Sequence, residues 1–250
     1  MSTNIHKGHV MRRSLISITV GVLVLVLAAW MARAQDNGAT TQPAQRILYQ
    51  PPPHSTSGMR INGTSRGAAD DLPMLYFLSP DHVGLTTQGK PSVFWFLSKD
   101  TTLPCVLTLT QDNQPEPAVE IHLNGSKAGM HRADFQQRGF TLKDNVQYQL
   151  SLALVPDMQH RSNDRFCSAY IEKIDPPAAL VAKLGMRARP EDRAVVYAQG
   201  GIWYDALMVL SDQIDSDPSN SSLREERAEL CEQVNLPEAA TYDRTSDLPK

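Results

Sequence analysis

The chain has 250 residues, a formal net charge of -3 and an apolar fraction of 41%. This composition is typical of an ordinary soluble body with room for one medium domain or two small ones. No block of basic residues is present, which argues against nucleic-acid binding. The cysteines and the histidines of the body show no metal-ligand spacing, so we expect neither a metal nor a cofactor.

Residues 15–32 form an almost unbroken apolar run, preceded by Arg12 and Arg13 and followed by Ala32-Arg33-Ala34. A basic start, an apolar centre and a small-x-small exit are typical of a secretory signal, here cleaved after Ala34. The alternative is an uncleaved anchor, because the run is almost long enough to span a bilayer. The first case predicts a periplasmic or extracellular protein. The second predicts a single-pass membrane protein that contacts the membrane only through residues 15–32, with its body outside the cytoplasm.

Residues 35–69 are polar and rich in Gly, Pro, Ser and Thr, with Pro51-Pro52-Pro53 at their centre. Such a segment contains too little apolar surface to fold alone. We therefore predict a disordered tether between the signal and the folded body.

Residues 70–175 contain short aromatic and β-branched runs separated by turn residues; the runs are 72–78, 92–97, 106–110, 118–123, 146–155 and 166–174. Apolar and polar residues alternate most clearly in 146–154, as expected of a strand with one face on a core. Several strands at this spacing predict an immunoglobulin-like β-sandwich domain, with a barrel as the alternative.

Two of the three cysteines, Cys105 and Cys167, lie in strand-like sequence. In an oxidising compartment they could form a disulfide. The alternative is a pair of buried free thiols, because the sequence does not show whether the two strands are neighbours. Cys231 lies in a helical segment, and we expect it in the core.

Pro176-Pro177 ends the predicted β domain, and residues 176–236 are predicted to be helical. The expected helices are 178–184, a pair over 190–199 and 203–214, and 223–234. Residues 237–250 are predicted to be a disordered tail.

The helix pair resembles a single tetratricopeptide unit. The aromatic, glycine, second aromatic, small, large and proline positions of that repeat are matched, in this order, by Tyr197, Gly201, Trp203, Ala206, Leu210 and Pro218. Stable arrays usually need at least three such units. We therefore expect a short helical hairpin appended to the sandwich, and the fold class is mainly β with a C-terminal α appendage.

A wider resemblance covers about residues 64–236. Its matching segments are Thr64-Ser65-Arg66-Gly67 and residues 72–80, 91–96, 148–152 and 197–207. They resemble the DUF928 family of exported proteins, known chiefly from cyanobacteria and without a characterised function. The most specific piece is Gly201-Ile202-Trp203-Tyr204-Asp205-Ala206-Leu207. Members of that family often carry two cysteines where this chain has Ala68 and Pro156, so the resemblance suggests that a disulfide of the family has been lost here. It implies a compartment and a fold, and no catalytic residues.

The three consecutive aromatic residues Phe94, Trp95 and Phe96 point alternately to opposite faces of a strand. One face must lie outside the sandwich core unless the helical unit covers it. We favour such a cover, because Trp203 and Tyr204 also need a surface to pack on. The alternative is a candidate interaction surface of Trp95, Trp203 and Tyr204, with Trp95 as a platform for a sugar ring or a partner protein.

These features favour an exported, non-enzymatic envelope protein that serves as a protein-interaction or structural module, with an unknown envelope protein as its partner. One alternative is a carbohydrate- or peptidoglycan-binding module, which depends on Trp95 and the sandwich geometry. A second is a hydrolase whose site is assembled from distant residues such as Asp81, His82 and His131. No serine or cysteine has a local catalytic signature, so no catalytic residue is assigned.

Overall fold

A computed structural model describes residues 46–53, 55, 60–62, 72–112, 114–186 and 190–246. The predicted signal or anchor, with its apolar run 15–32, lies outside these residues, as does most of the predicted tether. Among the helices of the described residues, none has the length and apolar character needed to cross a bilayer.

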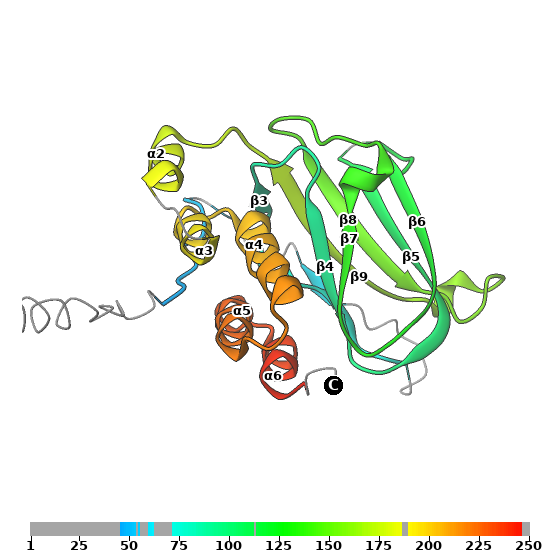
Figure 1. Cartoon of the computed structure of the whole chain (residues 1–250). Coiled ribbons are helices and arrows are strands. Elements are labelled where there is room, and N and C mark those ends of the chain that lie inside the picture. Colours follow the sequence, from blue (N-terminus) through cyan, green and yellow to red (C-terminus); the bar gives the residue numbers. More distant parts are fainter. Residues whose placement is uncertain are drawn as a thin grey trace, which may run out of the picture. The chain divides into compact units, whose positions relative to one another are not determined.

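The described strands form two sheets, which confirms a mainly β body (Figure 1). In the larger sheet the order is β1 (Ile61–Asn62), β9 (Arg165–Lys173), β8 (Gln147–Leu154), β5 (Thr101–Gln111) and β6 (Val119–Ser126), and β3 (Gly84–Thr86) pairs in parallel with β9. The smaller sheet contains β2 (Leu75–Phe77), β4 (Ser92–Leu97) and β7 (Gly129–Asp134).

The alternation in β8 gives that strand its inner face. Tyr148, Leu150 and Leu152 are completely buried, whereas Gln149 and Ser151 between them are half-buried. The sequence therefore predicted both the strand and the face that it turns to the core.

Three strands have no clear signal in the sequence, namely β1, β3 and β7. Strand β7 is polar for most of its length, and it forms because every residue pairs with β4, from Ser92↔Asp134 to Leu97↔Gly129. Strand β3 has only three residues and depends on its pairing with β9. Short or polar strands of this kind are specified by their neighbours, not by their own periodicity.

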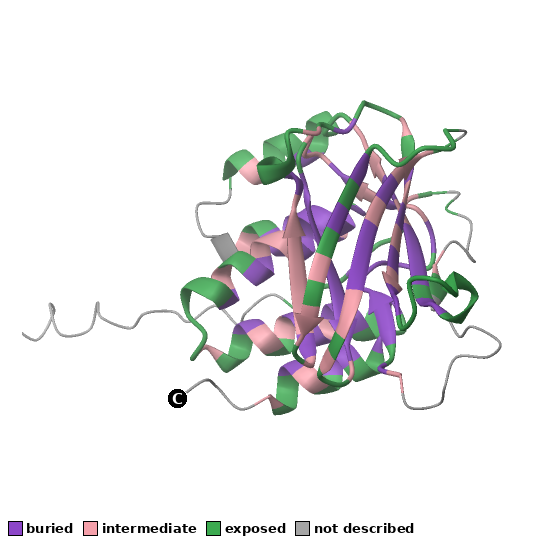
Figure 2. Ribbon diagram, turned by 90° about the vertical axis from the view of Figure 1, so that its right-hand side faces the viewer, coloured by how far each residue is buried: buried purple, intermediate pink, exposed green. Residues whose placement is uncertain are grey.

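The described residues form five α-helices, so the predicted hairpin appendage is wrong. These helices lie together on one side of the strands (Figure 1). They are α2 (Ala178–Met186), α3 (Pro190–Gln199), α4 (Trp203–Ser216), α5 (Ser221–Gln233) and α6 (Pro237–Thr245). Helix α4 contacts β3 and β4, and α6 contacts β7. From Gln45 onward the chain forms one compact unit. Figure 2 shows buried residues on both the strands and the helices.

The predicted disordered tail is wrong for residues 237–245, which form α6. An ion pair between two buried side chains holds this helix against α5. Arg227 donates through Nε to Asp243 Oδ2 at 2.8 Å and through Nη2 to Oδ1 at 2.6 Å, and Asp243 is 1% exposed. The tail prediction failed because this partner lies in the preceding helix and gives no local signal.

Part of the predicted tether also belongs to the folded body. Ile47 and Tyr49 are buried, and the Tyr49 amide donates to Gln233 Oε1 at 2.8 Å. The Gln50 amide donates to the Ala198 carbonyl at 3.0 Å. Residues 46–50 are therefore fixed to α3 and α5 by two backbone hydrogen bonds and by the burial of two apolar side chains.

The structure does not join Cys105 to Cys167, and all three cysteines are buried free thiols. Cys105 is on β5 and Cys167 on β9, and β8 lies between these strands. Strands two places apart are separated by about 9–10 Å. That distance exceeds the Cα separation of about 7 Å beyond which a disulfide cannot form.

Candidate functional site

The aromatic residues of the candidate interaction surface are buried, so that prediction is wrong and none of them offers a platform to a partner. Trp95 is 3% exposed, Trp203 0% and Tyr204 1%. Trp95 stacks on His131 across the strand pair, and Phe96 on the other face of β4 packs against Tyr242 of α6. The preferred alternative, a helical cover over the second face of β4, is what the structure has.

Trp203 and Tyr204 fasten α4 to the strands. Trp203 Nε1 donates to the Leu78 carbonyl at 2.8 Å, and Tyr204 Oη donates to the Tyr170 carbonyl at 3.1 Å. Gly84 of β3 lies against the Tyr204 ring, where an added Cβ would be 2.5 Å from Cε2. The most specific piece of the family resemblance is therefore partly structural. It attaches α4 to β9 of the larger sheet and to Leu78, which follows β2 of the smaller sheet.

Asp205, the next residue of the same segment, is 1% exposed and anchors the loop that follows β3. It accepts hydrogen bonds from Thr86 Oγ1 at 2.5 Å, from the Thr87 amide at 3.1 Å and from Thr87 Oγ1. Burial raises the pKa of Asp205, and these hydrogen bonds oppose that shift only in part. The Gln88 backbone amide donates to Thr86 Oγ1 at 3.0 Å. The hydrogen bonds around Asp205 therefore also hold residue 88 of this loop, which leads from β3 to β4.

A second polar cluster, the Arg132 network, joins β4, β7 and α4. Arg132 donates through Nε to Asp134 Oδ1 at 2.5 Å, through Nη2 to Ser92 Oγ at 2.8 Å and through Nη1 to Asp212. Ser92 Oγ donates to Asp134 Oδ1 at 2.5 Å. The guanidinium carbon lies 5.5 Å from the centre of the Phe94 ring. Three elements therefore hold the guanidinium in one orientation.

The network is half open to solvent, with the side chains of Arg132 and Asp134 29% and 31% exposed. Burial alone would lower the pKa of Arg132, but hydrogen bonds to Asp212 and Asp134 outweigh it and raise the pKa. Burial would likewise raise the pKa of Asp134, but hydrogen bonds from Ser92 and Arg132 lower it. Both groups are therefore charged at neutral pH and remain accessible to a ligand.

A pocket of about 560 Å³ opens beside this network. Its walls come from five parts of the chain: Gln88 and Lys90 from the loop before β4, Ser92 from β4, Arg132 and Asp134 from β7, Gln136 and Gln137 after β7, and Met208 and Asp212 from α4. The volume is within the range of small-molecule sites. We call this cavity the Arg132 pocket, and it is the candidate functional site.

Helix α4 connects the family segment to the Arg132 pocket. Asp205, Met208 and Asp212 are spaced i, i+3 and i+7, which places them on one face of the helix. The buried first position fixes the helix and the loop that carries Gln88. The two later positions line the pocket.

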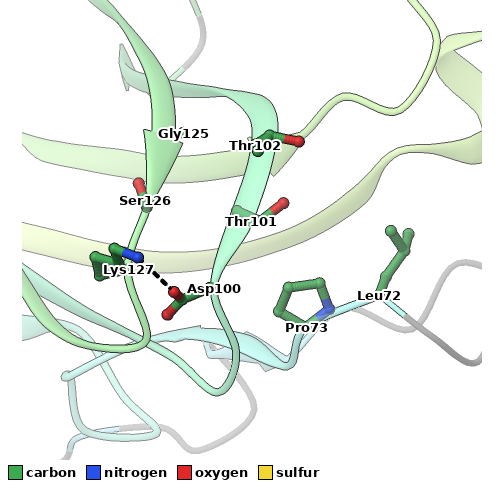
Figure 3. A pocket seen from close by; sticks show the side chains of 8 residues that line it. All are labelled: Leu72, Pro73, Asp100, Thr101, Thr102, Gly125, Ser126 and Lys127. Carbon is green, nitrogen blue, oxygen red and sulfur yellow. Dashed lines mark hydrogen bonds and ion pairs between the residues drawn. The ribbon is translucent and has the colours of Figure 1, made fainter.

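A second hollow, of about 610 Å³, lies where β5 begins and β6 ends, opposite the turn that joins these strands (Figure 3). Figure 3 shows Leu72 and Pro73 on one side of it and the ion pair of Lys127 and Asp100 on the other. This pair, with Nζ and Oδ2 2.7 Å apart, has side chains that are 88% and 61% exposed. Water screens such a pair and leaves it little fixed orientation, so this hollow is the weaker candidate.

The residues proposed for a hydrolase have separate partners. His82 contacts Tyr49 and the chain next to it: its Nε2 is 3.2 Å from Tyr49 Oη, and its Nδ1 is 2.9 Å from the Val83 carbonyl oxygen.

The other two residues have different neighbours. His131 Nε2 is 2.8 Å from the Lys127 carbonyl oxygen, and Asp81 lies near the Arg60 guanidinium. Within the described ranges, no group of three or more His, Cys, Asp and Glu residues is arranged to hold a metal ion.

Sequence reasoning missed the residues of the Arg132 network. Arg132 and Asp134 are two positions apart and hence on one face of a strand, and this signal could have been found once β7 was recognised. Their meeting with Asp212, which follows Arg132 by 80 positions, has no local signal.

Comparisons with known proteins identify a family and nothing more specific. No curated protein matches the sequence. A similar solved structure is the crystal structure of an engineered protein, with 13% identity and a TM-score of 0.30, and the match covers 42% of this chain and 21% of that one. The model of the DUF928 family, described as a domain of unknown function, matches residues 61–243. This chain therefore belongs to the DUF928 family.

Proposed function

We propose that this chain is an exported, non-enzymatic envelope protein that acts as an interaction module and contacts its partner through the Arg132 pocket. The observation that carries the proposal is the pocket itself, where open polar side chains surround a charge network held by β4, β7 and α4. Groups that are already oriented lose less conformational entropy when a partner binds.

The packing of α3 against α4 supports the tetratricopeptide-like part of the proposal. Ala206 is completely buried, and Tyr197 is 5% exposed. A small residue at this position allows two helices to approach closely, as that repeat requires. In our proposal the packing of α3 on α4 fixes the position of α4 against the strands. Helix α4 then forms one wall of the pocket.

Export is proposed from the apolar run 15–32 and the Ala32-Arg33-Ala34 exit. The test is a fusion of alkaline phosphatase, which folds only in an oxidising compartment, to the C-terminus of the full chain. We expect an active reporter, and the same fusion with residues 15–32 deleted should be inactive. A second fusion carries a reporter enzyme that is active only in the cytoplasm. Activity of this second fusion together with an inactive alkaline phosphatase fusion would contradict export.

The pocket is tested by capture of cross-linked envelope components with the tagged full chain, expressed in its own host. The pocket variant combines Lys90→Ala, Gln136→Ala and Gln137→Ala, three exposed residues of the pocket. The matched control variant combines Lys99→Ala, Gln114→Ala and Gln159→Ala, which are exposed residues outside it.

We expect the wild type and the control variant to retain the same components and the pocket variant to lose them. Exposed substitutions of this kind change stability by at most about 0.5 kcal/mol, so both variants should remain folded. Equal capture by all three proteins would show that the partner binds elsewhere.

A further inference from the structure

The charged residues that line the Arg132 pocket offer no excess of positive charge, and this restricts the ligand. Lys90 and Arg132 are opposed by Asp134 and Asp212. Asp215, which does not line the pocket, adds a third carboxylate 3.7 Å from Arg132 Nη1. The donors of the guanidinium already point at Asp134, Asp212 and Ser92. An anionic ligand would meet these carboxylates without finding a free guanidinium fork, and like charges at close range repel.

The remaining side chains offer both donors and acceptors. Gln136 and Gln137 are exposed and each present an amide NH₂ and a carbonyl oxygen, and Lys90 presents an ammonium group. The side-chain NH₂ of Gln88 already donates to Thr87 Oγ1. The hydrogen bonds from Arg132 and Ser92 reach Oδ1 of Asp134, and the hydrogen bond from Arg132 to Asp212 also reaches Oδ1, whereas a carboxylate has about four acceptor sites in all. A mixed set of this kind matches a ligand that can donate and accept at several points, which is the property of a sugar hydroxyl.

One apolar contact accompanies this polar set. Met208 is half-buried in the wall formed by α4. Its flexible thioether can adapt to the C–H face of a sugar ring. A cavity of about 560 Å³ has room for a small ligand of that type.

From this combination we infer that the Arg132 pocket binds a neutral saccharide unit. The inference rests on the proposed function and names the chemistry of its partner. It moves carbohydrate recognition away from Trp95, which is buried. The saccharide replaces water on the amides and on the free carboxylate oxygens, and the Arg132 network stays intact.

The test uses the purified full chain on an array of neutral, acidic and amine-bearing glycans, each present as oligomers and as free monosaccharides. We expect the wild type and the control variant to bind neutral glycans, and the pocket variant to bind them at least tenfold more weakly. Binding of oligomers alone would identify an envelope polysaccharide as the source. Binding of monomers as well would identify a free sugar.

Salt dependence separates a neutral ligand from a charged one. Because ions screen only charged partners, the affinity should be nearly constant between about 0.05 and 0.5 M salt. A steep fall with salt, a preference for acidic or amine-bearing glycans, or no glycan binding by the wild type would overturn the inference. If capture depends on the pocket but the wild type binds no glycan on the array, the saccharide inference is wrong and the proposed function still stands. Inactive export reporters and failed capture would remove the proposed function itself.

Discussion

Asp205 and Asp134 are the same chemical group in two different environments. Each accepts a hydrogen bond from a hydroxyl of a strand residue, Thr86 in one case and Ser92 in the other. Asp205 is 1% exposed and its partners are hydroxyls and an amide, so burial raises its pKa. The Asp134 side chain is 31% exposed and lies beside Arg132, and its pKa is lowered although its partial burial opposes the shift.

The difference distinguishes a carboxylate with a structural role from a carboxylate that a ligand can reach. A carboxylate that is sealed among hydroxyls fixes the position of a helix and a loop, and it is closed to any ligand. A carboxylate that is balanced by a half-exposed arginine keeps its charge and its access to solvent. The following predictions test whether the two aspartates are separable in this way.

The largest effect is expected for Asp205→Ala. The change leaves the hydroxyls of Thr86 and Thr87 and the Thr87 amide without their acceptor in a buried place. Unsatisfied buried donors of this kind should lower the free energy of unfolding by about 3 kcal/mol. Urea unfolding monitored by circular dichroism measures it. Asp212→Ala on the same helix is the control, and an equal loss there would remove the distinction between the two regions.

Gly84→Ala tests the neighbouring contact on the buried side. The new Cβ would lie 2.5 Å from Cε2 of Tyr204, a ring that is 1% exposed and hydrogen-bonded to the Tyr170 carbonyl. Overpacking should cost about 2 kcal/mol, measurable as a lower thermal midpoint. The matched control is Gly185→Ala in α2, where an added Cβ has no heavy atom within 4 Å and should be neutral or slightly stabilising. A stable Gly84→Ala protein would show that α4 is not closely fastened to β3.

Arg132→Ala should have a smaller effect on stability. It removes hydrogen bonds to Asp134, Ser92 and Asp212 that solvent already weakens. We expect a loss of about 1 kcal/mol in the free energy of unfolding, as for partly exposed charge pairs. Lys127→Ala, which breaks the exposed pair with Asp100, should have no measurable effect. A loss as large as that of Asp205→Ala would mean that the pocket network is part of the core.

The pH dependence should have opposite signs at the two aspartates. The pKa of Asp205 is raised in the folded state, so the unfolded chain loses this proton first and the contribution of Asp205 to stability falls as pH rises above about 4. The pKa of Asp134 is lowered, so its contribution is present above about 4 and is lost as pH falls through the folded-state value. Asp205→Asn and Asp134→Asn each remove one of these slopes, and unfolding free energies from acidic to neutral pH measure them. Equal slopes in both variants would contradict the comparison.

The sequence predicted the elements whose own residues carry a periodic pattern. The alternation of β8, the aromatic run of β4 and the four helices from α2 to α5 were all visible locally. The other elements depend on partners that are distant in sequence. Strand β7 needs β4, α6 needs the pair of Arg227 and Asp243, and residues 46–50 need Ala198 and Gln233.

The candidate site shows the same division. The family segment pointed to α4, but its aromatic residues are structural, and the residues that line the pocket lie one and two turns further along the helix. Arg132 and Asp134 could have been paired by their spacing. Their meeting with Asp212 required the fold, because no periodicity relates a strand to a helix 80 positions later.

Chemical labelling of the three buried thiols can measure how often the folded protein opens. Burial raises the pKa of Cys105 and of Cys231 to about 12, so each is a neutral thiol that a labelling reagent reaches only after local or global opening. Cys105 belongs to the larger sheet and Cys231 to α5. Their modification rates therefore report separately on the strands and the helices. Coincident rates would mean that the two layers open as one cooperative unit, and a faster Cys231 would mean that the helices detach first.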